Sequence, residues 1–378
     1  MSFIAKLIVP LLCLVLASCQ AGTTEDVLGG LANQPPAPAQ ETLGTGPVPV
    51  TLLVARNAGD PARRNVAHDV YHGAALALRE LGANQLSISV LEASGGPDTV
   101  RALAAQAAAS GSKLILSAQD GSATSALATI SPVPPVIDLT GTRSAGKSVF
   151  AFASDEVASA LEGVAAAVAA KQTRVVVAVP AGMPADAVER LRKGVRGHGA
   201  TLTDIVAYPP APAALAGALA ARRTAFEKAT TLVVFGEGDA PARVARAVAT
   251  GGYGGAITTL IGNFSWRQQQ FSDPVLDGAL IAMIDQQSLK ELGARFSAAT
   301  GRPLSLEAAF AYDAVALAAG LVRARGNDAI VAGAFGPTAW YAGTTGEFRF
   351  DAERNVDRAL VLYRVQGGQL VPLPGASN

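Results

Sequence analysis

The strongest constraint on the fold of this chain is a repeated alternation of short apolar runs and segments with helical spacing. It is clearest between Lys113 and Arg143, where apolar runs at 113–117 and 136–139 flank a helical segment at 122–130. Unbroken apolar runs of this length are typical of parallel strands that are covered on both faces. Neighbouring parallel strands bring the loops that follow them, here 117–122 and 140–144, to one edge of a sheet. Ligands bind at that edge in open α/β sheets, so these loops are the first candidates for a binding site.

The alternation extends over most of the chain in two successive series. The first predicts strands at 48–55, 86–91, 113–117 and 136–139, with helices at 65–81, 99–110 and 122–130. After an extended segment at 149–153, Asp155 is expected to cap a helix at 157–170. The second series predicts strands at 174–179, 201–207, 231–235 and 258–261, with helices at 184–197, 212–221 and 240–249. This pattern predicts an α/β fold with two lobes, each built on a doubly wound parallel sheet.

The last hundred residues predict a return of the chain between the lobes. A strand is expected at 278–284, helices at 289–300 and 306–324, and a hairpin from 346–350 and 359–365 with a third short strand at 370–373. The two helices need a sheet to cover. If that sheet belongs to the first lobe, the chain crosses between the lobes more than once, and the lobes flank a cleft.

The N-terminus has the features of an export signal. Lys6 precedes an apolar run at 7–16, and the run ends in Leu-Ala-Ser followed by Cys19. The run is too short for a spanning helix, and its flanks are those of a secretory signal. The ending resembles the bacterial lipobox, which implies a signal peptide at 1–18, lipidation of Cys19 and a periplasmic, membrane-anchored protein. The alternative is an ordinary secretory peptide with a chance cysteine at this position.

The segment after the cysteine is expected to be a flexible tether, at 19–47. It is rich in Ala, Gly, Pro, Gln and Thr and shows no apolar period. Gln20 follows the cysteine where enterobacterial lipoproteins of the inner membrane carry Asp. That resemblance favours the outer membrane.

The composition limits the partners and the chemistry. The formal net charge is zero, and no cluster of Lys and Arg with aromatic residues occurs, so nucleic acid is not an expected partner. Both cysteines lie within the first 19 residues, and only Cys19 would remain in the mature chain. This leaves no disulfide, no thiolate metal site and no cysteine nucleophile, and no cofactor is expected.

Three short motifs occur in the order and spacing of a known family. They are the Gly-Ala-Ala-Leu-Ala of 73–77, the Tyr-Asp-Ala-Val of 312–315, and the Gly-Thr-Thr-Gly-Glu-Phe-Arg-Phe-Asp of 343–351. With them, the region from 48 to 373 resembles the type I periplasmic binding proteins of the leucine/isoleucine/valine-binding group. The resemblance implies a clamshell with lobe I at 48–152 and 280–336 and lobe II at 153–279 and 337–374. The ligand would bind in the cleft, and hinge closure would exclude water.

The resemblance also implies candidate ligand residues in lobe I. Amino-acid-binding members hold the ligand carboxylate with a Ser and a Thr hydroxyl from two loops, helped by N–H groups at helix N-termini. The Thr140-Gly141-Thr142 loop is similar to the Ala-Ala-Thr of the family, so Thr142 is the expected ligand hydroxyl.

The other lobe I loop departs from the family pattern. The ligand serine of the family falls on Gly121. Ser122 would compensate for it, but Asp120 would repel a carboxylate. The alternative for Asp120 and Ser122 is that they cap the following helix.

Lobe II offers three further candidates, which follow the strands at 231–235 and 258–261. They are Glu237, Asp239 and Asn263. An acidic side chain here would suit a ligand ammonium group. The alternative is that Glu237 and Asp239 are solvated or cap the helix that begins near Pro241. The family often places an aromatic residue after the first strand of lobe II, but 180–183 contains none. Its absence makes a free branched-chain amino acid doubtful as the ligand.

Catalytic and metal motifs are weak or missing in the sequence. His68 and His72 have the spacing of a zinc-protease helix, but Asp69 stands where the base is Glu, and the remaining histidine, His198, follows a distant helix. A polar helix face is therefore favoured over a metal site. No nucleophile elbow and no phosphate-binding loop occurs, so an enzyme is not expected.

Two functions remain open. The favoured one is the solute-binding lipoprotein of an ABC importer, which would deliver a small polar ligand, such as an amino acid or amide, to an ABC permease. The alternative is an activator of a penicillin-binding protein, a peptidoglycan synthase, that uses the same fold to bind protein. The segments 348–351, 360–362 and 367–368 are similar to lipoproteins often assigned that role.

Overall fold

The computed structural model describes residues 40–130, 134–266 and 271–373, and Glu41–Asn378 form one compact unit. The expected signal peptide (1–18), the lipidated Cys19 and most of the expected tether (19–47) lie outside the described residues. The last part of that tether contains a strand, β1 (Gln40–Leu43). Among the described residues, no helix combines the length and hydrophobicity needed to cross a bilayer.

The first sheet has six strands in the order β1-β3-β2-β4-β5-β6. The five after β1 are β2 (Val48–Val54), β3 (Leu86–Glu92), β4 (Leu114–Ser117), β5 (Val136–Asp138) and β6 (Val149–Ala151). These five pair in parallel with their neighbours. Both faces of the sheet are buried, as the unbroken apolar runs predict, because Leu52 packs into one core and Leu53 into another.

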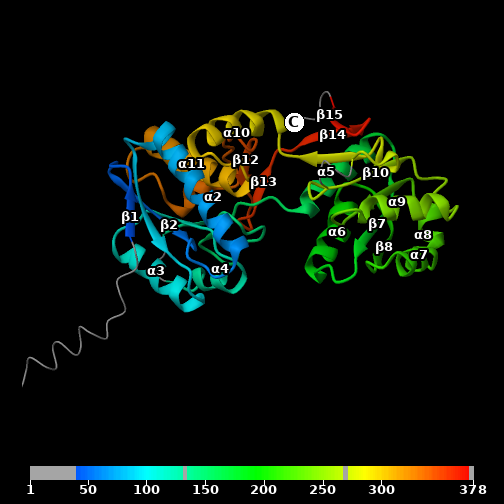
Figure 1. The fold of residues 1–378 in the computed structure, drawn as a ribbon, viewed down its shortest axis with the longest axis horizontal. Helices are drawn as coiled ribbons and strands as arrows, with labels where there is room; N and C mark the ends of the chain where they lie inside the picture. Colours follow the sequence, from blue (N-terminus) through cyan, green and yellow to red (C-terminus); the bar gives the residue numbers. More distant parts are fainter. Residues whose placement is uncertain (1–39, 131–133, 267–270, 374–378) are drawn as a thin grey trace, which may run out of the picture. The chain divides into compact units, whose positions relative to one another are not determined.

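Five helices cover this sheet. On one face lie α2 (Pro61–Ala77), which continues as a π-helix at Leu78–Gly82, together with α10 (Gln286–Thr300) and α11 (Leu306–Arg325). On the other face lie α3 (Pro97–Ala109) and α4 (Gly121–Leu127). Helices α2 and α11 are distant in sequence but pack along one another (Figure 1).

The second sheet has seven strands in the order β15-β14-β11-β10-β9-β7-β8. Its parallel part consists of β7 (Arg174–Pro180), β8 (Thr201–Tyr208), β9 (Thr231–Val234), β10 (Thr259–Ile261) and β11 (Leu280–Met283). Two antiparallel strands, β14 (Val361–Gln366) and β15 (Gln369–Pro372), complete one edge.

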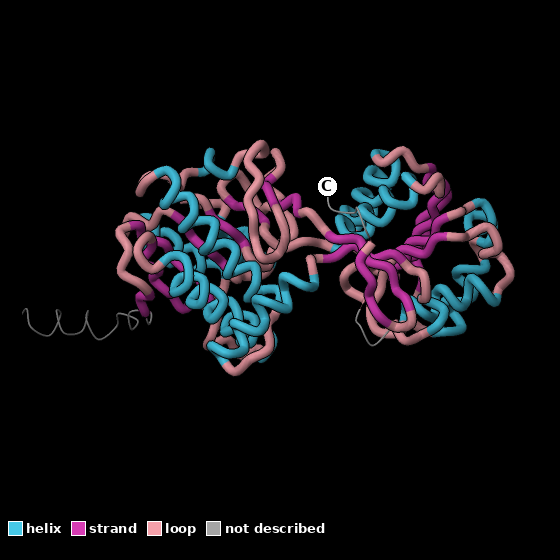
Figure 2. Tube along the Cα trace, turned by 90° about the horizontal axis from the view of Figure 1, so that it is seen from above, coloured by secondary structure: helices cyan, strands magenta, loops and turns pink. Residues whose placement is uncertain are grey.

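Helices cover both faces of the second sheet as well (Figure 2). One face carries α5 (Glu156–Ala169) and α6 (Ala185–Gly197). The other carries α7 (Pro212–Ala220), α8 (Arg223–Lys228) and α9 (Ala240–Thr250). The predicted α/β class with two doubly wound sheets is therefore confirmed. The predicted cap is also confirmed, because the Asp155 side chain accepts a hydrogen bond from the Ala158 N–H at the start of α5.

The C-terminal hairpin differs from the prediction. Strand β12 (Phe348–Phe350) pairs with β13 (Val356–Arg358), not with 359–365, and that later segment is β14, which pairs with β11 and β15. The reason is an aromatic cluster in the first core. The Phe350 ring lies 5.0 Å from that of Phe150, and the Phe348 ring lies 4.9 Å from that of Phe152. Burying these rings fixes the partner of β12, which local pattern does not specify.

The chain passes between the two sheets at three places. These are residues 152–155 between β6 and α5, 284–285 between β11 and α10, and 359–360 between β13 and β14. Consequently β11, expected with the first lobe, belongs to the second sheet, and the β12–β13 hairpin, expected with the second lobe, packs on the first core.

Candidate functional site

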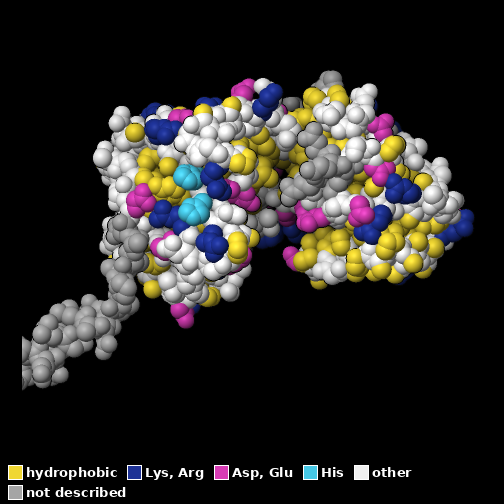
Figure 3. All heavy atoms as spheres, in the orientation of Figure 1, with side chains coloured by type: hydrophobic (Ala, Val, Ile, Leu, Met, Phe, Trp, Pro, Cys, Tyr) yellow, Lys and Arg dark blue, Asp and Glu magenta, His cyan; other side chains and the backbone are white. Residues whose placement is uncertain are grey.

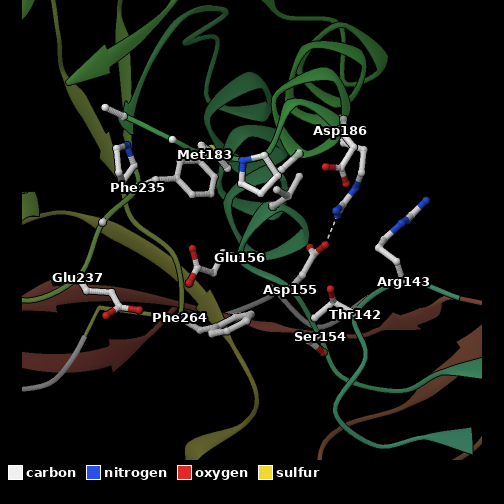
Figure 4. Close-up of a pocket in the computed structure, with 18 residues that line it drawn as sticks. Thr142, Arg143, Ser154, Asp155, Glu156, Met183, Asp186, Phe235, Glu237 and Phe264 are labelled. Atoms are coloured by element: carbon white, nitrogen blue, oxygen red, sulfur yellow. Dashed lines mark hydrogen bonds and ion pairs between the residues drawn. The ribbon is translucent and has the colours of Figure 1, made fainter. Parts of the chain in front are cut away.

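A cavity of about 760 Å³ lies where strands of both sheets end (Figure 4). One wall comes from the loop after β5 and the segment after β6, and the other from the loops after β7, β9 and β10. Its polar and charged side chains are Thr142, Arg143, Ser154, Asp155, Glu156, Asp186, Arg190 and Glu237. Smaller cavities of about 430 Å³ and 250 Å³ share Thr142 and Ser154 with it.

Asp138, the last residue of β5, shapes the loop that carries Thr142. It is only 1% exposed, and its Oδ1 accepts hydrogen bonds from the backbone N–H groups of Thr140 (3.2 Å) and Gly141 (3.0 Å). A Cβ at Gly141 would lie 2.1 Å from Asp138 Oδ2, so only glycine allows this close turn. Burial raises the pKa of the Asp138 carboxyl to about 6, although the hydrogen bonds from Thr140 and Gly141 oppose the rise.

The two threonines of this loop have different surroundings. The Thr140 hydroxyl donates to the carbonyl oxygen of Gln119 at 2.7 Å and lies 3.1 Å from Asp138 Oδ1, so it is used to hold the loop. Thr142 is exposed and lines all three cavities. The structure thus places Thr142 at the cavity, with Gly141 as the turn that presents it, and the ligand role of Thr142 stays a prediction.

The loop that contains Asp120, Gly121 and Ser122 lines none of the three cavities. Asp120 stands before the first residue of α4, but its side chain makes no capping hydrogen bond there. Its carboxylate instead lies 3.5 Å from Arg63 Nε in an exposed ion pair. The ligand role of these three residues stays a prediction.

The three candidates from the second sheet are separated by the structure. Glu237 is exposed and lines the cavity. Asp239 precedes α9, lies 3.3 Å from Arg243 Nε and does not line it. Asn263 is fully buried, and its Oδ1 accepts hydrogen bonds from Ser265 N–H at 2.9 Å and Ser265 Oγ at 2.6 Å. Its Nδ2 has no hydrogen-bond partner among the described residues.

The sequence analysis missed several residues of the cavity wall. Asp155 caps α5 and also pairs with Arg190 of α6, the contact dashed in Figure 4. An apolar part of the wall consists of Pro180, Met183, Phe235 and Phe264. Phe235 directly follows β9 and Phe264 lies three residues after β10, so their place after a parallel strand was the available signal.

The cavity therefore combines charged groups with an apolar wall. Four carboxylates and two guanidinium groups line it, and Asp155 is paired with Arg190. A cavity of this kind suits a small solute that has both polar and apolar parts. Among the described residues, no group of three or more His, Cys, Asp and Glu side chains is arranged to hold a metal ion.

The histidine pair on α2 lies away from this cavity. His68 and His72 line none of the three cavities, and Asp69 is bound to Arg302 at 2.7 Å. Figure 3 shows the histidine side chains at the surface beside Lys or Arg side chains. Burial and the nearby Arg302 lower the pKa of His72. The face is polar, as the sequence analysis favoured.

Comparison with known proteins identifies the fold. No family model and no curated protein matches the sequence. Among solved structures, a putative branched-chain amino acid ABC transporter from Rhodospirillum rubrum matches with a TM-score of 0.66 and 16% identity, covering 86% of this chain and 99% of that one. A Rhodopseudomonas palustris solute-binding protein in complex with benzoate matches with a TM-score of 0.56 and 18% identity, covering 88% and 97%.

The chain has the type I periplasmic-binding-protein fold. A second R. palustris protein, an ABC-type branched-chain amino acid transporter, matches with a TM-score of 0.66 and 15% identity over 88% of this chain and 98% of that one. At these identities the likeness establishes the fold alone, and a fold supports many functions. The function of this protein therefore depends on which groups line its cavity.

Proposed function

We propose that this protein is an extracytoplasmic ligand-binding protein of the leucine-binding type, the solute-binding component of an ABC importer. The observation that carries the proposal is the cavity at the strand ends, with Thr142 and Arg143 on one wall and Glu237 on the other. A small polar solute with an apolar part, such as an amino acid or an amide, matches these groups. The similar structures include proteins named as ABC transporter components.

Binding is proposed rather than catalysis. Of the 18 described residues that line the cavity, none is a histidine or a cysteine, and Ser154 is the only serine among them. A serine needs an adjacent base to become a nucleophile. The Ser154 hydroxyl instead accepts a hydrogen bond from the Arg358 guanidinium, which cannot act as that base.

The proposal includes a lipid anchor at Cys19 and a periplasmic location, with the outer membrane favoured. It rests on the Leu-Ala-Ser-Cys sequence after an apolar run. Labelling of the protein by a fatty-acid analogue in cells, lost in Cys19→Ser, is the expected result. Labelling that persists in Cys19→Ser would rule out this anchor.

The second candidate function is the activation of a peptidoglycan synthase. The observation that favours it is the loop at Asp120–Ser122, which faces none of the three cavities and has glycine where a ligand serine was expected. A protein that binds another protein does not need that serine.

A thermal-shift screen with amino acids, their amides and aromatic carboxylates tests the proposal. A ligand present at a hundredfold excess over its dissociation constant stabilises the folded state by about 2.7 kcal/mol. For a ligand found in this way, Glu237→Gln should weaken binding at least tenfold, whereas Asp239→Asn, two residues away but outside the cavity, should leave the affinity near that of the wild type. No shift with any compound, together with capture of a peptidoglycan synthase, would favour the second candidate.

A further inference from the structure

Ser154 lies between β6 and α5, with its side chain between the cavities and Arg358. It lines all three cavities, as Thr142 does, and both are labelled at one end of the site in Figure 4. Its Oγ accepts a hydrogen bond from Arg358 Nε at 3.0 Å. This is the only hydrogen bond of the Ser154 side chain among the described residues. A hydroxyl has one proton to donate, so the Ser154 O–H is left to serve an acceptor in the cavities.

Arg358 is held rigidly behind Ser154. It is 7% exposed, and its Nη2 donates to the carbonyl oxygen of Phe152 at 2.9 Å, while its Nη1 donates to the Thr345 hydroxyl. Three aromatic rings surround the guanidinium, those of Phe152, Phe310 and Phe348, with centroids at 4.9, 5.0 and 5.2 Å. A guanidinium in this setting has no freedom to turn away from Ser154.

The buried Arg358 guanidinium remains protonated. Burial lowers its pKa to about 10, while the negative charge of Asp313 acts in the opposite direction, so the group is a cation at neutral pH. Asp313 is itself fixed by the backbone N–H groups of Thr344 and Thr345, each at 2.8 Å. A buried cation bound to a hydroxyl oxygen makes the proton of that hydroxyl a stronger donor.

We propose that the Ser154 hydroxyl binds an anionic oxygen of the ligand and that Arg358 is the positioning residue that orients and polarises it. This rests on the proposed function, because it assigns the ligand group that the same cavity receives. The Thr142 hydroxyl lines the same three cavities and supplies a second donor. The ligand is therefore a solute that carries a carboxylate or a phosphate.

Three carboxylates that line the cavity of about 250 Å³ together with Ser154 are engaged by other protein groups. Asp155 is paired with Arg190, and Asp357 lies 2.8 Å from Arg349. Asp351 accepts hydrogen bonds from the backbone and side chain of Asn355. The donor at Ser154 thus remains available to the ligand.

Calorimetric titration with matched compounds tests the proposal. The probes are L-leucine with L-leucinamide, and benzoate with benzamide and phenyl phosphate, because each set changes the anionic group and keeps the apolar part. The expected result is at least tenfold tighter binding of the anionic member than of its amide. In Ser154→Ala this preference should fall at least tenfold, with the affinity for the amide unchanged.

Two further variants separate binding from folding. Arg358→Lys keeps the charge but loses the planar guanidinium group that donates to several acceptors at once. The variant should therefore show a weaker preference for the anion over the amide even where the protein remains folded. Ser110→Ala is the control, since Ser110 is exposed and lines none of the three cavities, and it should bind as the wild type does. Tighter binding of phenyl phosphate than of benzoate would assign a phosphate, and the reverse a carboxylate.

The outcomes against the proposal are distinct from those against the proposed function. If amides bind as tightly as the anions, or if Ser154→Ala retains the full preference, the role of Ser154 is wrong while solute binding stands. If none of the probes binds, amides included, the proposed function fails and this inference falls with it.

Discussion

At the scale of single residues, Asp138 links burial to the pH dependence of stability. Its carboxyl has a pKa of about 6 in the folded protein, against 3.8 for an ordinary aspartate, because burial disfavours the charged form. The folded state thus holds this proton more tightly than the unfolded chain. The Asp138 contribution to the free energy of unfolding should therefore rise as the pH falls from about 6 to about 4.

Asp138→Asn isolates that contribution. Asparagine keeps an oxygen to accept from Thr140 and Gly141 but does not titrate. At about 1.4 kcal/mol per pKa unit, the wild type should gain up to about 3 kcal/mol relative to the variant between pH 7 and pH 4. Urea unfolding at several pH values measures this, and parallel pH profiles of the two proteins would contradict it.

Thr142 tests the loop that Asp138 shapes. Thr142→Ala removes an exposed hydroxyl at the cavity, so the ligand affinity should fall at least tenfold, or about 1.4 kcal/mol, with little change in the melting temperature. The matched variant is Thr140→Ala. The Thr140 hydroxyl is bonded to Gln119, so that change should lower the melting temperature. Unchanged affinity in Thr142→Ala would remove Thr142 from the site.

At the scale of elements, the contact between α2 and α11 depends on Gly73. A Cβ at this position would lie 2.1 Å from the carbonyl oxygen of Ala308, which is backbone and cannot turn aside. Gly73→Ala should therefore force the two helices apart and destabilise the protein by about 1–3 kcal/mol.

Gly320, within α11, provides the control for that helix pair. A Cβ there meets nothing within 4 Å, so Gly320→Ala should stabilise the protein by about 0.5–1 kcal/mol through helix propensity. Chemical denaturation of both variants measures the two effects. Equal effects of the same sign would show that packing against Ala308 does not limit position 73.

At the scale of the whole molecule, Arg358 ties together segments that are far apart in sequence. Its hydrogen bonds join it to Phe152 and Ser154, in the 152–155 passage, and to Thr345. Arg358 itself directly precedes the 359–360 passage. Arg358→Met would remove the hydrogen bonds to Ser154, Phe152 and Thr345, and each buried polar group left without a partner typically costs about 1–3 kcal/mol. Arg349→Met breaks a half-exposed pair with Asp357 and a contact with the Trp340 ring, each worth about 1 kcal/mol or less. Denaturation midpoints compare the two, and similar losses would refute the structural role of Arg358.

The sequence by itself determined the elements and the edge of the sheets where the cavity lies. Apolar runs such as 113–117 and 136–139 can be buried on both faces only in parallel strands between helices, and this requirement is local. The same holds for the cap at Asp155, which needs only a carboxylate three residues before the Ala158 N–H. Thr142 was found because its loop follows such a strand and resembles the Ala-Ala-Thr of the family.

Only the tertiary structure decided which distant segments meet. The pairing of β12 with β13 and the cage around Arg358 depend on how aromatic side chains from separate segments pack. The place of β11 in the second sheet depends on its pairing with β10 and with the distant β14. Likewise, the sequence gives no sign that Asp138 is buried or that Ser154 has a guanidinium behind it. The physical reason is that burial and pairing are properties of the assembled core, whereas periodicity and capping act within a few residues.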